Sequence, residues 1–147
     1  MKRHSALVPL SRDHHQSLVL AQRLRRATDD TFSDTARMFL AHWEAEEQQH
    51  FCLEEEILLP AYTAHGTPQH PAILRTLVEH AVIRRDAAQL TVAPTLEVLH
   101  LIGVRLADHI AFEEQELFPL IEAALTEAEL GVLGDRIEDR VPPQLQG

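Results

Sequence analysis

The sequence of 147 residues has one cysteine, Cys52, one lysine, Lys2, and no asparagine. A single cysteine excludes an intramolecular disulfide framework and a zinc site built from several thiolates. No apolar run approaches the ~18 residues that are needed to cross a membrane. The N-terminal segment also lacks the apolar stretch of a signal peptide, so we expect a cytoplasmic protein.

Positive charge is scarce as well. The 13 lysine and arginine residues face 23 aspartate and glutamate residues, which gives a formal net charge of −10. A surface of this sign repels phosphate backbones and anionic lipid headgroups, so we expect neither nucleic acid nor membrane as a partner. The composition is unusual in another way, because ten residues are histidine. We therefore look for the function among histidines that lie near carboxylates.

The sequence shows no strand pattern. Its β-branched residues are scattered rather than alternating, and alanine, leucine, glutamate, glutamine and arginine are frequent. The length and the 45% hydrophobic content predict one domain, residues 1–147, with one core. Cap and turn residues, starting with a cap at Ser11, divide the chain into four long predicted helices: about residues 11–28, 34–62, 71–90 and 94–125.

Four long helices with short connections predict an all-α fold, an antiparallel up-down-up-down four-helix bundle. A short fifth helix can follow at the C-terminal end. Thr126 and Glu129 have the spacing of a capping box, and Pro142 and Pro143 then end regular structure.

The sequence contains an internal repeat. Residues 51–60 resemble residues 110–119, and each segment follows a histidine. The pattern His-x-x-x-Glu-Glu therefore occurs twice, with His50 and Glu54 in one copy and His109 and Glu113 in the other. The preceding helices also correspond, since each has an acidic residue followed by histidine. Two copies of a helix pair are what a pseudo-symmetric four-helix bundle needs.

The repeated histidines and glutamates lie on apolar helix faces. Residues four apart on a helix are separated by only ~40°, so His50 and Glu54 share a face. That face also carries Trp43. His109 and Glu113 lie in the same way on the apolar stripe of the fourth helix. These polar groups are thus expected in the bundle core.

The first and third helices each add one histidine. His80 shares an apolar stripe with Ala87, seven residues later. The first helix offers His14 and His15. We choose His14, because Leu18 follows it by four residues on the same stripe, whereas His15 is turned away by ~100°. His15 is the alternative, and it is expected at the bundle edge or in solvent.

These residues predict a metal centre. An uncompensated buried carboxylate costs several kcal/mol, and two divalent cations between the groups would remove that cost. Each cation would take two histidine nitrogens, and two bridging glutamates would leave room for an oxo or hydroxo bridge and an exogenous ligand. Imidazole and carboxylate ligands suit iron first, then manganese or zinc. The candidate ligands are His14, His50, Glu54, His80, His109 and Glu113.

The arrangement resembles the hemerythrin-like HHE cation-binding family over about residues 9–121. The resemblance implies a four-helix bundle that holds a non-haem di-iron centre able to bind O2, with the same six residues as ligands. Oxygen-carrying hemerythrins differ, with two histidines on the third helix and His-x-x-x-x-Asp on the fourth. Here Thr76 and Arg84 lie four residues from His80, so the ligand set has one histidine fewer and is closer to symmetric.

Other residues near these faces have supporting roles in our interpretation. Asp13 and Glu79 can hold histidine rings without touching metal. His42 and Glu46 lie near enough to the same face of the second helix for a similar role. Cys52 points off this face and is expected to be a small buried residue rather than a redox thiol.

Glu116 has three alternative roles. It follows His109 by seven residues, so it can be an extra ligand, a proton relay or the partner of an arginine such as Arg105. We favour the arginine partner. The remaining histidines are expected in solvent or on the surface: His4, His65, His70 and His100.

Three functions compete at this point. The first is a non-enzymatic metalloprotein that binds O2, NO or iron for sensing, storage or the handling of iron and oxidative stress. The second is a di-iron enzyme that reduces O2 or peroxide, or that oxidises a small substrate. It is less favoured, because ferritin-like enzymes have two Glu-x-x-His motifs at the metal site, whereas here such a glutamate, Glu47, precedes His50 and none precedes His109. The third, a metal-free helical interaction protein, leaves the repeated core polar groups unexplained.

Overall fold

A computed structural model describes residues 2–140, which form helices and connecting turns without any strand. The first rod is α1 (Val8–Arg26), after a short 3-10 turn, η1 (Ser5–Leu7). The second rod consists of α2 (Phe32–His42), η2 (Trp43–Glu47), α3 (Gln48–Leu53), η3 (Glu54–Leu58) and α4 (Leu59–His65). The third rod is α5 (Pro71–Val92). The fourth consists of α6 (Leu96–Phe112), η4 (Glu113–Leu117) and α7 (Phe118–Ala124), and α8 (Glu127–Arg140) follows it.

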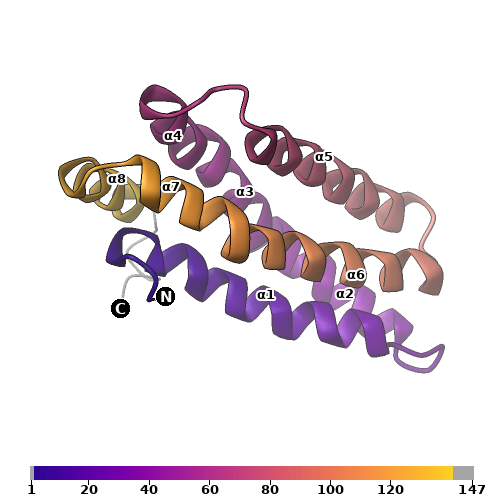
Figure 1. Cartoon of the computed structure of the whole chain (residues 1–147). Helices are drawn as coiled ribbons and strands as arrows, with labels where there is room; N and C mark the ends of the chain where they lie inside the picture. Colours follow the sequence, from indigo (N-terminus) through magenta and orange to yellow (C-terminus); the bar gives the residue numbers. More distant parts are fainter. Residues whose placement is uncertain (1, 141–147) are drawn as a thin grey trace.

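The four rods lie side by side, and α8 sits at one end of them beside the N-terminal segment (Figure 1). Helix α6 packs along both α1 and α5. The stretches η2, η3 and η4 are π-helical turns within otherwise continuous rods. No helix among residues 2–140 is both long enough and apolar enough to span a bilayer.

Side chains cap several of the helices. The hydroxyl of Thr95 accepts a hydrogen bond from the Val98 N–H at 3.1 Å, which starts α6. The predicted capping box of α8 is confirmed. The N–H of Thr126 donates to Glu129 Oε1 at 2.8 Å, and the N–H of Glu129 donates to Thr126 Oγ1 at 3.2 Å. Helix α8 continues to Arg140, so it is longer than the short helix expected, and Pro142 and Pro143 lie outside the described residues.

The predicted start of the first helix is wrong. Helix α1 begins at Val8, three residues before Ser11, with Pro9 in its first turn, where proline's fixed φ and missing N–H are favourable. Ser11 does not cap the helix, and its hydroxyl donates to Glu114 Oε2 at 2.8 Å instead. The predicted start of the third helix at residue 71 is confirmed, since α5 begins at Pro71. The remaining limits shift by one to three residues, and the fourth rod starts after Thr95 rather than at residue 94.

Two hydrophobic clusters fill the interior, one towards each end of the rods. The first includes Leu10, Leu58, Ile73, Phe118 and Ile137. The second includes Leu24, Phe39, Phe51, Leu90 and Ile102. Along α1 and α5 the first cluster comes before the second, and along the other two rods the order is reversed. Buried histidines and glutamates occupy the level between the clusters, so apolar packing encloses them from both ends.

Candidate metal centre

The structure brings all six candidate ligands together. Each of them is buried, and His80, Glu54 and Glu113 are completely inaccessible to solvent. They form two overlapping groups, in each of which the potential ligand atoms lie within 4.8 Å of one another. One group contains His14 and His50, the other contains His80 and His109, and both glutamates belong to both groups. Their role as ligands stays a prediction that the geometry permits.

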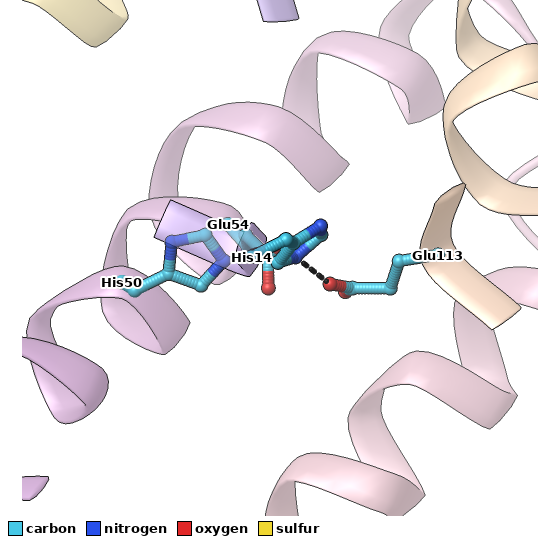
Figure 2. Close-up of side chains that lie close together, drawn as sticks. All are labelled: His14, His50, Glu54 and Glu113. Atoms are coloured by element: carbon cyan, nitrogen blue, oxygen red, sulfur yellow. Dashed lines mark hydrogen bonds and ion pairs between the residues drawn. The ribbon is translucent and has the colours of Figure 1, made fainter. Parts of the chain in front are cut away.

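Figure 2 shows the first of these groups. His14 comes from α1, His50 and Glu54 come from the α3–η3 segment, and Glu113 comes from η4. The side chains converge on one small space, and the dashed line joins His14 to Glu113. The group therefore combines three of the four rods.

Each imidazole turns its Nε2 atom toward a carboxylate oxygen of Glu54 or Glu113. The closest of these oxygens lies 2.9 Å from His14, 3.3 Å from His50, 3.1 Å from His80 and 3.3 Å from His109. Glu54 receives His50 and His80, while Glu113 receives His14 and His109. Each glutamate thus serves one histidine from each group, as a bridging carboxylate would.

The opposite nitrogen of each imidazole, Nδ1, is held by one of four further carboxylates, which we call the outer carboxylates. Asp13 holds His50 at 3.0 Å, Glu55 holds His80 at 2.6 Å, Glu79 holds His109 at 2.8 Å and Glu114 holds His14 at 2.6 Å. An ionised carboxylate only accepts, so Nδ1–H is the donor in each pair. This contact fixes the ring so that the Nε2 lone pair faces the interior, as in metal-binding histidines.

Several of the inward-facing atoms have no hydrogen-bond partner among residues 2–140. They are the Nε2 atoms of His50, His80 and His109, both carboxylate oxygens of Glu54 and Oε2 of Glu113. Buried polar atoms are nearly always hydrogen-bonded, because leaving them unpaired costs free energy. Nitrogen and carboxylate lone pairs that converge in this way fit a cation. The donor set, with imidazole and carboxylate but no thiolate, suits iron, manganese or zinc.

The outer carboxylates Glu55 and Glu114 were not assigned a role from the sequence. Each is the second glutamate of a His-x-x-x-Glu-Glu motif, and each lies in a π-helical stretch that begins at the glutamate facing the centre. π turns occur frequently at functional sites. The doubled glutamate was therefore the available signal, although its partner histidine lies on a different rod. The predicted holding roles of Asp13 and Glu79 agree with the contacts found.

Three of the outer carboxylates are also paired with arginine. Arg84 binds Glu55 through two nitrogens at 2.8 and 3.0 Å, Arg75 binds Glu79 at 2.7 Å and Arg3 lies 3.4 Å from Glu114. Asp13 is different, because no arginine among the described residues lies within ion-pair distance of it. Its side chain is 55% exposed, against 24–29% for the other three. The surroundings of the four outer carboxylates therefore differ in charge and in access to solvent.

Electrostatics at the centre favours positive charge. Burial by itself lowers the pKa of His109, but the negative charge and close approach of Glu113, at 3.3 Å, and the hydrogen bond to Glu79 raise it to about 10. The same opposing effects raise the pKa of His14 and of His80 to about 9. Burial raises the pKa of Glu113, yet contacts with the histidines lower it well below its ordinary value. Glu113 thus requires a positive partner, which can be a proton or a metal cation.

Aromatic rings cover two of the imidazoles. Phe51 stacks on His80 with ring centroids 3.9 Å apart, and Phe118 stacks on His14 at 5.2 Å. Both phenylalanines are fully buried. They hold the rings in place and keep water away from them, which strengthens electrostatic interactions within the centre.

Other residues singled out from the sequence lie outside the centre. His15 is exposed, in contrast to its buried neighbour His14. Glu116 is also largely exposed and pairs with an arginine, as favoured, but its partner is Arg75 at 3.4 Å. Arg105 instead binds Asp86 at 2.6 Å.

The second rod holds a buried carboxylate, Glu47, whose hydrogen bonds were not predicted from the sequence. Glu47 accepts hydrogen bonds from the Ser17 hydroxyl and from His42 Nε2, at 2.5 and 2.8 Å. His42 also pairs with Glu46 at 3.1 Å, so these two residues stay beside the centre without reaching it. Cys52 is only partly buried.

The expectation that His4 and His70 are simply solvated is wrong. Both rings cap helices, because their Nδ1 atoms accept hydrogen bonds from the N–H groups of Ala6 and Ala72, each at 3.0 Å. His65 is largely exposed, at 42%, and pairs with Glu129. The partly buried ring of His100 donates to the carbonyl of Ala27 at 2.7 Å.

Comparison with known proteins supports this interpretation of the centre. A family model described as the hemerythrin HHE cation binding domain matches residues 6–122, a range that includes all six candidate ligands. No curated protein and no solved structure matched the chain. The family match covers well over half of the sequence and coincides with the rods that form the centre. The chain therefore belongs to the hemerythrin HHE cation-binding domain family.

Proposed function

We propose that this protein binds two metal ions, with iron the favoured metal, and that the loaded centre binds O2 or a related small ligand such as NO. The observation that carries the proposal is the set of buried, unpaired nitrogen and oxygen atoms that face one another between the rods. The frame for it is the expected antiparallel up-down-up-down bundle, in which each rod supplies at least one ligand.

The two overlapping groups support a stoichiometry of two. His14 and His50 would hold one ion, His80 and His109 would hold the other, and Glu54 and Glu113 would contact both. When bound, a di-iron centre supplies redox-active metal with coordination positions for a diatomic ligand. We further propose a role in sensing, storage or the handling of iron and oxidative stress.

The protein's own groups orient and shield the centre. The outer carboxylates keep each Nδ1 protonated, so that each Nε2 lone pair stays available for a cation. The buried rings of Phe51 and Phe118 limit the approach of water. Binding without turnover is the simpler proposal, since it requires no substrate beyond the small ligand.

Metal analysis and an absorption spectrum of protein from iron-replete cells test this proposal. We expect about two irons per chain, since each ion needs two histidines, together with near-UV bands of oxo-bridged iron. Manganese or zinc at the same stoichiometry would keep the site and change the metal. A colourless, metal-free and fully stable protein would overturn the proposal. Turnover of peroxide or O2 above the rate of free iron would favour the enzyme alternative.

Variants of the ligands provide the matched comparison. We expect His50→Ala and Glu54→Ala to lose metal, because each removes a ligand and neither replacement can coordinate a cation. Unchanged metal content in either variant would refute the ligand assignment. Glu56→Ala is the control, since Glu56 is exposed and pairs with Arg140 on the surface.

A further inference from the structure

Beside Asp13, the centre adjoins a cavity of about 690 Å³ between α1 and the η2–α3 segment. Both Asp13 and His50 line this cavity, and none of the other five candidate ligands does. His50 is buried, and its Nε2 atom lacks a hydrogen-bond partner among the described residues. One imidazole therefore belongs both to the cavity wall and to the centre.

The charge of the cavity wall is mainly negative. Its carboxylates are Asp13, Glu44, Glu46, Glu47 and Glu56. Among the described residues, Arg12 and Arg140 are the only basic side chains apart from histidine in the lining, and Arg140 pairs with Glu56 at 2.7 Å. A concave surface with an excess of one sign of charge concentrates ions of the opposite sign. This wall therefore attracts cations.

Asp13 is the outer carboxylate best suited to receive a cation. The charges of Glu55, Glu79 and Glu114 are compensated by arginine, whereas no described arginine lies within ion-pair distance of Asp13. Its hydrogen bond to His50, at 3.0 Å, is also the longest of the four, the others being 2.6–2.8 Å. The His50 ring is thus the least tightly held of the four imidazoles.

We propose that divalent cations reach the centre through this cavity, and that Asp13 receives them and transfers them to His50. When Asp13 releases Nδ1, the His50 ring is free to turn toward the cavity, while the other three imidazoles remain fixed by their arginine-paired carboxylates. This inference rests on the proposed metal centre and concerns the route to it. Its ligand is a hydrated divalent cation in transit.

The test is stopped-flow uptake of Co2+ by metal-free protein without O2, with chelator extraction as the reverse measurement. We expect Asp13→Asn to slow uptake by roughly three- to tenfold and to weaken its dependence on salt, because one steering charge is lost. The amount of Co2+ bound at saturation should stay the same, since the asparagine oxygen still accepts the His50 Nδ1–H.

Glu97→Gln is the control. It makes the same change of carboxylate to amide at an exposed residue in the first turn of α6, outside the cavity lining. We expect its uptake rate to stay within about twofold of the wild type, because the steering field of the cavity is unchanged. A second variant, Gln16→Trp, places bulk at an exposed position of the cavity wall and should also slow uptake.

The outcomes separate the two proposals. Equal uptake rates for the wild type and Asp13→Asn, or equal slowing in Asp13→Asn and Glu97→Gln, would overturn the route, although the wild type would still bind metal. A wild type that binds no Co2+ at equilibrium would overturn the metal centre itself.

Discussion

Glu54 and Glu113 are the residues on which the interpretation of the centre depends. Both are completely buried, and neither carboxylate oxygen of Glu54 has a hydrogen-bond partner among the described residues. Buried carboxylates of this kind destabilise a domain unless a proton or a cation compensates their charge. Around them, single residues decide which atoms face the centre, because each outer carboxylate orients one histidine ring.

The neighbouring residues His14 and His15 give a direct test at this scale. We expect His14→Ala to lose at least one of the two proposed metal ions, because its buried ring offers one of the potential ligand atoms. His15→Ala should keep both ions, since this ring is exposed. Elemental analysis of the two purified variants checks the expectation, and the reverse pattern would assign the ligand to His15.

The outer carboxylate Glu55 should affect metal affinity without contacting metal. We expect Glu55→Gln to weaken binding by roughly 10–100-fold, because the amide holds the His80 ring less strongly and loses the ion pair with Arg84. Competition with a chelator of known affinity measures the change. Glu56→Gln, one residue further along, is the control and should bind as the wild type does.

Among the elements, the fourth rod packs against two other rods and also carries part of the centre. Its α6 segment packs on α1 and α5, and η4 then presents Glu113 and Glu114 in succession. The approach of α1 to α6 is close at Gly103, where an added Cβ atom would lie 2.8 Å from the Ala21 carbonyl oxygen. The π turns and this close approach together place His14 next to Glu113.

A pair of glycine substitutions tests that close approach. We expect Gly103→Ala to lower the free energy of unfolding by about 1–3 kcal/mol, because the methyl group forces α1 and α6 apart. Gly131→Ala in α8 is the matched control, since its Cβ would meet no atom within 4 Å. That variant should gain about 0.5–1 kcal/mol from helix propensity. Urea denaturation of both proteins measures the difference, and equal effects would contradict close packing at Gly103.

In the whole molecule, the polar layer separates two apolar clusters, so the centre and the stability of the fold are linked. The clusters hold the rods together on both sides, while the layer between them adds unpaired charge. A ligand that binds only the folded state stabilises it by mass action.

Metal should therefore raise the stability of this protein. At a free metal concentration 100 times the Kd, we expect a gain of about 2.7 kcal/mol for one site, visible as a higher Tm in calorimetry. Chelation should reverse the gain. The Glu54→Ala variant serves as the control, and a metal-induced rise in its Tm equal to that of the wild type would place the binding elsewhere.

The local sequence pattern was sufficient to predict much of the secondary structure and several buried positions of this protein. Helical periodicity depends only on neighbours along the chain, so it predicted the four long helices, the buried position of His14 and the common face of His50 and Glu54. The capping box at Thr126 was equally readable, because its two hydrogen bonds join residues three apart.

Contacts between distant parts of the chain were decided by the tertiary structure. Glu114 holds His14, one hundred residues away in sequence. It also accepts a hydrogen bond from the Ser11 hydroxyl, which was expected to cap the first helix. Arg75 rather than Arg105 pairs with Glu116 for the same reason. The exposure of Asp13 and the cavity beside it also arise only when the rods pack. The charge and the solvent access around each outer carboxylate depend on the side chains that neighbouring rods place there.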